Sequence, residues 1–84
     1  MKIKYTNHAK KKFADLRIFG IIVTQAQIAR ILKSPKYRSQ DNGNLVKAGD
    51  FDERHNLRVV HKKEKDAIII ITFYIYRKGR YGEY

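Results

Sequence analysis

Arginine, tyrosine and histidine side chains are the residues of this sequence that could carry chemistry, and they gather in its second half. The stretch "ERHNLRVVH" contains Arg54, His55, Arg58 and His61, and the chain closes with "YIYRKGRYGEY". Guanidinium groups match phosphate oxygens in pairs, and tyrosine rings stack on unpaired bases. Histidine titrates near neutral pH and can therefore move protons. Together these groups could hold RNA and cleave it.

Metal-free RNA cleavage needs a base for the 2′-hydroxyl, an acid for the leaving oxygen and cations for the charged transition state. His55 or His61 could be the base, and Glu53 could replace them. The electrostatic contribution, usually the largest one, would come from arginines. The candidates for it are Arg54, Arg58, Arg77 and Arg80.

Each of these residues also has an ordinary structural explanation. The Lys10–Lys12 run is typical of a solvated helix face, and His8 would be a first-turn surface residue. Tyr74 and Tyr76 suit a half-buried strand, and we expect His61 to be solvated beside a turn. The scattered histidines lack metal-ligand spacing, and no glycine-rich phosphate loop is present. We therefore expect no metal and no cofactor.

The composition narrows the class of partner. Among 84 residues, 19 Lys and Arg face 8 Asp and Glu, which gives a net charge of +11. This excess favours attraction to nucleic acid, an anionic membrane surface or an acidic protein. The sequence has no cysteine, which excludes disulfides and fits a reducing compartment. The longest apolar run, "AIIIITFYIY", is half of the ~20 residues that a membrane helix needs. We expect a soluble, cytoplasmic protein with one domain spanning residues 1–84.

Local signals define two helices after a short strand at 2–5. Thr6 is a suitable N-cap for a helix over 7–19, with Ala9, Phe13 and Leu16 on one apolar face and Gly20 at its C-terminal end. Thr24 opens a second helix over 25–33, which Pro35 terminates.

The period then changes to that of strands. Asn42-Gly43 predicts one hairpin, and "KKEKD" joins the two strands of a second. The order strand, helix, helix, four strands favours an α+β fold, with two helices on one face of a four- to five-stranded antiparallel sheet. The last strand is apolar on both faces in its first half and should therefore be central.

The second hairpin also predicts which side chains share a face. Ala67, Ile69, Ile71, Phe73 and Ile75 should lie under the helices. A turn centred on residues 64–65 pairs Leu57 with Thr72 and His55 with Tyr74. The opposite face would then end in a polar group made of His55, Thr72, Tyr74 and Tyr76. A one-residue bulge would bring Arg58 onto that face instead.

Two stretches resemble a known superfamily. "HAKKK" followed by "FGIIVTQAQIARILKSP" resembles the opening of short RelE/ParE-superfamily proteins, and "NLRVVHKKEKDAIIIITFYIYRKGRYGEY" resembles their ending. BrnT toxins share this layout, including a Glu-x-Arg-like step near Glu53-Arg54.

The resemblance implies a type II toxin-like, metal-independent ribonuclease that acts on single-stranded or ribosome-held mRNA and is restrained by an antitoxin. His8 matches the motif histidine, whereas Lys12 stands where arginine is usual and lacks its fork. The other positions carried over are Arg58, Thr72, Arg77, Arg80 and Tyr84.

The expected site divides into two groups of residues. The catalytic group is His8, His55, Arg58, Arg77 and Arg80. The substrate-binding group is Lys12, Arg54, Thr72, Tyr74, Tyr76, Tyr81 and Tyr84. ParE-like relatives bind gyrase instead of cutting RNA, so a non-catalytic gyrase inhibitor or a plain RNA-binding module is the alternative.

Overall fold

The chain begins with a strand and a helix joined by a single capping residue. The computed structural model describes residues 2–84, in which β1 (Lys2–Tyr5) leads through Thr6 into α1 (Asn7–Ile18). The Thr6 hydroxyl accepts a hydrogen bond from the Ala9 amide and donates one to the Ile71 carbonyl, each at 3.1 Å. The N-cap predicted for Thr6 is confirmed, and it also fastens the helix to a distant strand.

The second helix is set by equally local signals. Gly20 ends α1 with a φ of +77°, in the left-handed region that glycine adopts freely. α2 (Gln25–Lys33) starts with a capping box, in which Thr24 and Gln27 each bond the other's backbone amide. Within residues 2–84, neither helix is long and apolar enough to cross a membrane.

The sheet has five strands in the order β1-β5-β4-β3-β2. The later strands are β2 (Tyr37–Asp41), β3 (Asn44–Asp50), β4 (His55–Glu64) and β5 (Ala67–Arg77). β5 lies between β1 and β4, as expected for a strand that is apolar on both faces. β1 runs parallel to β5, whereas the other pairs are antiparallel. The prediction of an antiparallel sheet was therefore wrong, because four alternating residues carry no signal for strand direction.

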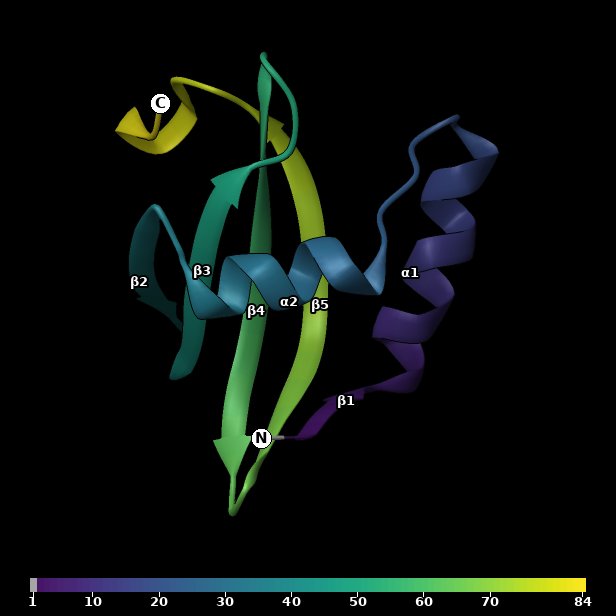
Figure 1. The fold of residues 1–84 in the computed structure, drawn as a ribbon, viewed down its shortest axis with the longest axis vertical. Helices are drawn as coiled ribbons and strands as arrows, with labels where there is room; N and C mark the ends of the chain where they lie inside the picture. Colours follow the sequence, from purple (N-terminus) through teal and green to yellow (C-terminus); the bar gives the residue numbers. More distant parts are fainter. Residues whose placement is uncertain (1) are drawn as a thin grey trace.

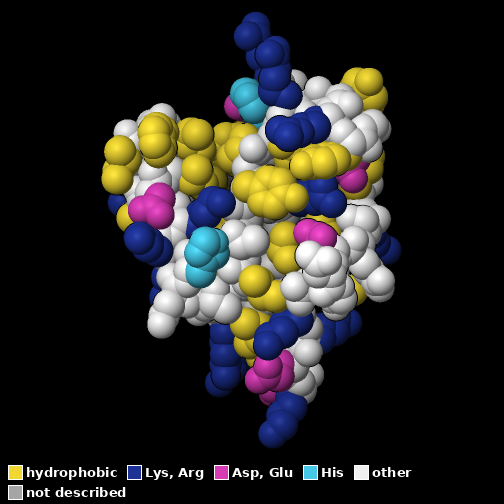
Figure 2. Space-filling model, turned by 180° about the vertical axis from the view of Figure 1, so that it is seen from behind, with side chains coloured by type: hydrophobic (Ala, Val, Ile, Leu, Met, Phe, Trp, Pro, Cys, Tyr) yellow, Lys and Arg dark blue, Asp and Glu magenta, His cyan; other side chains and the backbone are white. Residues whose placement is uncertain are grey.

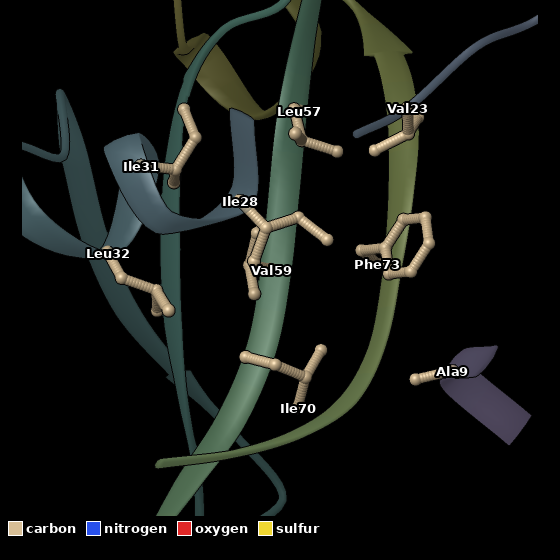
Figure 3. Packing of buried hydrophobic residues seen from close by; sticks show 9 residues of the cluster. All are labelled: Ala9, Val23, Ile28, Ile31, Leu32, Leu57, Val59, Ile70 and Phe73. Carbon is tan, nitrogen blue, oxygen red and sulfur yellow. The ribbon is translucent and has the colours of Figure 1, made fainter. Parts of the chain in front are cut away.

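Both helices pack on one face of this sheet (Figure 1). α2 crosses β3 and β4, and α1 lies along β5 and β1. The two helices share one apolar core with the central strands (Figure 3). Its buried members are Ala9, Val23, Ile28, Ile31, Leu32, Leu57, Val59, Ile70 and Phe73.

A β-bulge changes the predicted register between β4 and β5. The turn falls at Lys65 and Asp66, one residue later than expected, so that Glu64 pairs with Ala67. The register then shifts between Val60 and His61, where β5 carries Ile71 as an extra residue. A bulge reverses the faces on one side of it. Ile68 and Ile70 therefore join Phe73 and Ile75 under the helices, in place of the predicted Ile69 and Ile71.

The first hairpin has the predicted geometry. Asn42 and Gly43 both have positive φ, 51° and 83°, as a type I′ turn requires. The second hairpin pairs Leu57 with Ile75 and His55 with Arg77, where Thr72 and Tyr74 were predicted. These shifts decide which side chains meet on the open face of the sheet.

Candidate nucleic-acid interface

Arg58 occupies the centre of the sheet face that the helices leave uncovered. Its neighbours on β4, Leu57 and Val59, belong to the core under the helices, so Arg58 points to the other side. The ladder aligns it with Ala48 on β3 and Tyr74 on β5. This is the arrangement that the bulge alternative predicted.

Two tyrosine rings contact the Arg58 guanidinium. Its carbon lies 4.5 Å from the centroid of Tyr81 and 5.9 Å from that of Tyr74. The only side-chain hydrogen bond recorded for it within residues 2–84 is a long one of 3.4 Å, from Nη2 to the Ser39 hydroxyl. The Arg58 Nε atom is buried and has no hydrogen-bond partner among the described residues. Arg58 is thus held mainly by aromatic contacts, which leaves it short of hydrogen-bond acceptors.

The last residues fold back over this face and bring Tyr81 with them. Gly79 has a φ of 98° and turns the chain into a short 3₁₀ helix, η1 (Arg80–Gly82), in which Tyr81 itself has a φ of 61°. A non-glycine residue in this region costs about 1–2 kcal/mol. The Gly79 amide donates to the Glu83 carbonyl at 2.7 Å and closes the turn.

Glu83 anchors the turn to the sheet beneath it. The Tyr76 hydroxyl donates to the Glu83 carboxylate, and the Asn56 side-chain amide donates to the Glu83 carbonyl at 3.3 Å. Burial is the main cause that raises the pKa of Tyr76, and the Glu83 carboxylate raises it further. Tyr76 is only 3% exposed, so it packs beneath the turn and offers little surface for a base.

We call the surface formed by Arg58, Tyr74, Arg80 and Tyr81 the Arg58 patch. The Arg80 guanidinium lies 5.5 Å from the Tyr81 ring centroid, on the same turn. Figure 2, which views the molecule from behind Figure 1, shows side chains of the hydrophobic class, which includes tyrosine, interleaved with Lys and Arg on this face. Tyr81 is 57% exposed, which leaves ring surface open to a ligand.

His55 does not belong to the Arg58 patch, which corrects the predicted polar group. It precedes Leu57 by two residues and therefore points to the helix side of the sheet, at the end of β4. There it contacts Asp52, with 2.9 Å between the imidazole Nδ1 and the Asp52 Oδ1. Asp52 was not among the predicted site residues. The spacing of Asp52 and His55 in the loop "DERH" was the available signal, since Asp commonly bonds backbone amides a few residues on.

Two predicted arginines lie beside His55. Arg77 is directly opposite it in the ladder and is exposed. Arg54 is exposed in the preceding loop, and its carbonyl accepts the Lys78 amide at 2.8 Å. Lys78 in turn places its Nζ 2.9 Å from an Asp50 carboxylate oxygen. These residues lie at the end of the sheet where β5 finishes.

The remaining predicted residues lie outside both groups. His8 and Lys12 are on α1, in the helix layer. Thr72 is half-buried and pairs with Val60. Tyr84 is exposed, and its carbonyl accepts a hydrogen bond from the Lys36 ammonium at 3.0 Å.

The expectation that His61 is solvated was wrong. It is 1% exposed and pairs with Ile70, next to the bulge and on the sheet face that the helices cover. Its Nδ1 lies 3.2 Å from the Val59 carbonyl. Burial is the main cause that lowers the pKa of His61, and the charges of Lys47 and Lys63 lower it further. A buried imidazole of this kind has no route to a substrate.

Comparison of the chain with models of protein families, with curated proteins and with solved structures finds no match.

Proposed function

We propose that this protein binds unpaired RNA across the Arg58 patch. The observation that carries the proposal is the position of Arg58, held between Tyr74 and Tyr81 with only a long 3.4 Å hydrogen bond from its Nη2 to Ser39 within residues 2–84. A phosphate oxygen would bind the terminal nitrogens of this guanidinium better than the Ser39 hydroxyl does. The exposed Tyr81 ring would stack on a base, as in other proteins that bind single strands.

The charge of the whole chain supports a polyanion over a neutral ligand. The net charge of +11 raises the local concentration of RNA around the protein. Double-stranded RNA is a poorer match, because its paired bases cannot stack on a tyrosine.

Metal-independent cleavage of the bound RNA is the second candidate function. The specific observation in its favour is a histidine with an aspartate partner at the same end of the sheet as the patch. In this form the protein is a RelE-like toxin of a type II toxin–antitoxin system. It acts on cytoplasmic mRNA, free or on the ribosome, and an acidic antitoxin restrains it. The resemblance of the sequence to that superfamily supports this form. The alternatives are an RNA-binding module without catalysis and a gyrase-type inhibitor.

The binding proposal is tested with a labelled single-stranded RNA and three variants. Arg58→Ala should weaken binding by roughly tenfold or more, because one charge-assisted contact and its stacking are worth about 1–3 kcal/mol. Arg58→Lys should restore only part of the affinity, since lysine keeps the charge without the planar fork. Arg17→Ala, at the exposed end of α1, is the charge-matched control and should change affinity little. Equal losses in Arg58→Ala and Arg17→Ala would refute the patch as the binding surface.

Cleavage is tested by incubating the protein with labelled RNA in excess EDTA, alone and with translating ribosomes. Products with 2′,3′-cyclic phosphate or 3′-phosphate ends, absent from an Arg58/Arg77/Arg80 triple alanine variant, would support the ribonuclease. RNA that is bound in a salt-sensitive way but stays whole in both settings would support the binding module.

A further inference from the structure

We propose that Asp52 and His55 form the proton-transfer pair of this protein, in which Asp52 is a positioning residue that leaves the His55 Nε2 free to accept a proton. The inference rests on the proposed cleavage function, and it names the site where the chemistry would occur. The proposed site of chemistry is separate from the Arg58 patch, which binds the RNA.

The Asp52 carboxylate is fixed by the backbone of its own loop. Its Oδ1 accepts hydrogen bonds from the amides of Arg54 and His55, at 2.9 and 2.7 Å. These bonds, together with His55, hold the pKa of Asp52 below its usual value. The carboxylate is therefore ionised at neutral pH. It cannot rotate away from the imidazole without breaking its hydrogen bonds to these backbone amides.

The fixed carboxylate determines which imidazole nitrogen carries the proton. Nδ1 of His55 lies 2.9 Å from Oδ1 and 3.2 Å from Oδ2 of Asp52. Because an ionised carboxylate only accepts hydrogen bonds, Nδ1 must be the donor. In the neutral imidazole this leaves the lone pair on Nε2. The two side chains are 37% and 50% exposed, so a substrate can approach them.

Two arginines lie beside the pair. Arg77 faces His55 across the ladder, where directly opposite Cβ atoms lie roughly 5 Å apart. Arg54 belongs to the same loop, and the loop residues line a shallow depression that also includes Glu53. A phosphate held there would meet guanidinium groups beside a proton acceptor, which is the combination that phosphodiester cleavage requires.

The pair and the patch are close enough to share one RNA chain. His55 and Arg58 are three residues apart on β4, or roughly 10 Å along the strand, and they point to opposite faces. An RNA strand bound on the Arg58 patch would reach the Asp52–His55 pair by crossing the end of the sheet. Arg77, Lys78 and Arg80 lie at that crossing.

The proposed step balances without an oxidant or a metal. His55 Nε2 takes the proton of a ribose 2′-hydroxyl, and the 2′-oxygen forms a bond to phosphorus. The bond from phosphorus to the 5′-oxygen breaks, and that oxygen takes a proton from water. The products are a 2′,3′-cyclic phosphate and a 5′-hydroxyl, and the imidazolium returns its proton to solvent.

The tautomer can be measured without any activity. Long-range ¹H–¹⁵N spectra of the ¹⁵N-histidine-labelled protein, recorded where His55 is neutral, should show its proton on Nδ1. Asp52→Asn should lose this preference, whereas Asp66→Asn, an exposed turn residue at the other end of β4 and β5, should keep it. A proton on Nε2 in the wild type would overturn the assignment.

The role in cleavage has its own readout. His55→Ala should lower the cleavage rate by roughly 10²-fold or more while RNA affinity is kept, and added imidazole should restore part of the rate. Asp52→Asn should lower the rate less, because the imidazole remains. Cleavage that survives His55→Ala would overturn the pair alone. RNA that is bound but never cleaved, with or without ribosomes, would overturn the pair together with the cleavage function and leave the binding function standing.

Discussion

The contact between Arg58 and Tyr81 should appear as a coupling free energy in unfolding experiments. The guanidinium carbon lies 4.5 Å from the ring centroid, within the range of a cation–π interaction. Such contacts contribute about 0.5–1 kcal/mol at exposed sites and about 2 kcal/mol when desolvated. Tyr81 is 57% exposed, whereas Nε of Arg58 is buried. We therefore expect a coupling of about 1 kcal/mol.

A double-mutant cycle isolates this value. Arg58→Met keeps much of the aliphatic length and removes the charge, and Tyr81→Leu keeps an apolar side chain on the same backbone. Urea unfolding of the wild type, the two single variants and the double variant gives the coupling directly. Tyr81→Gly adds an internal check, because glycine relieves the positive φ of 61°. It should be about 1 kcal/mol more stable than Tyr81→Leu.

Two results would refute this reasoning. A coupling free energy indistinguishable from zero would mean that the ring and the guanidinium are not in contact in solution. A Tyr81→Gly variant less stable than Tyr81→Leu would mean that the turn does not hold Tyr81 in the left-handed conformation. Either result would also remove the main support for Tyr81 as part of the Arg58 patch.

Three further predictions concern buried groups. The lowered pKa of His61 makes stability fall as the pH drops below about 6.5, because the unfolded chain then takes up a proton that the folded chain does not. In urea unfolding between pH 7.5 and 5, the free energy of unfolding of His61→Leu should decrease less than that of the wild type. Equal decreases in the two proteins would contradict this. The raised pKa of Tyr76 means that its contribution to stability is complete below pH 10 and is lost as the pH rises. Tyr76→Phe should lower the free energy of unfolding by about 1–2 kcal/mol at neutral pH and flatten its alkaline loss. An alkaline profile like that of the wild type would contradict the raised pKa. A Cβ at Gly49 would lie 2.7 Å from Ile31 Cδ1, so Gly49→Ala should lower the free energy of unfolding by about 1 kcal/mol or more. Ile31→Val removes that methyl group, so it should destabilise the Gly49→Ala variant less than it destabilises the wild type. Equal destabilisation in the two backgrounds would contradict the clash.

The features that could be predicted from the sequence are those fixed by neighbouring residues. The Thr6 and Thr24 caps act on amides three residues later. The turn at Asn42 and Gly43 follows from their tolerance of positive φ. Each of these depends on a few consecutive residues, so no knowledge of the rest of the chain was needed.

The features that could not be predicted depend on distant contacts. The bulge at Ile71 is accompanied by a hydrogen bond from the Thr6 hydroxyl to its carbonyl. Nothing in the apolar run "AIIIITFYIY" marks one of its residues as extra, because all of them suit a strand. The bulge nevertheless decides that Arg58, and not His55, joins Tyr74 on the open face.

The candidate site shows the same division. Arg58, Tyr74, Arg80 and Tyr81 could be named from the sequence, because their residue types suit RNA. Glu83 was missed, since one acidic residue in a basic tail gives no sign that a buried tyrosine will bind it.

The Thr6 hydroxyl group also has a consequence for the order in which the protein can assemble. It donates a hydrogen bond to a carbonyl 65 residues further along the chain, and within residues 2–84 the only sheet neighbour of β1 is β5. During synthesis, β1 therefore has no strand to pair with until nearly the whole domain has left the ribosome. Contacts of such sequence separation slow folding, so closure of the β1–β5 pair should be a late event.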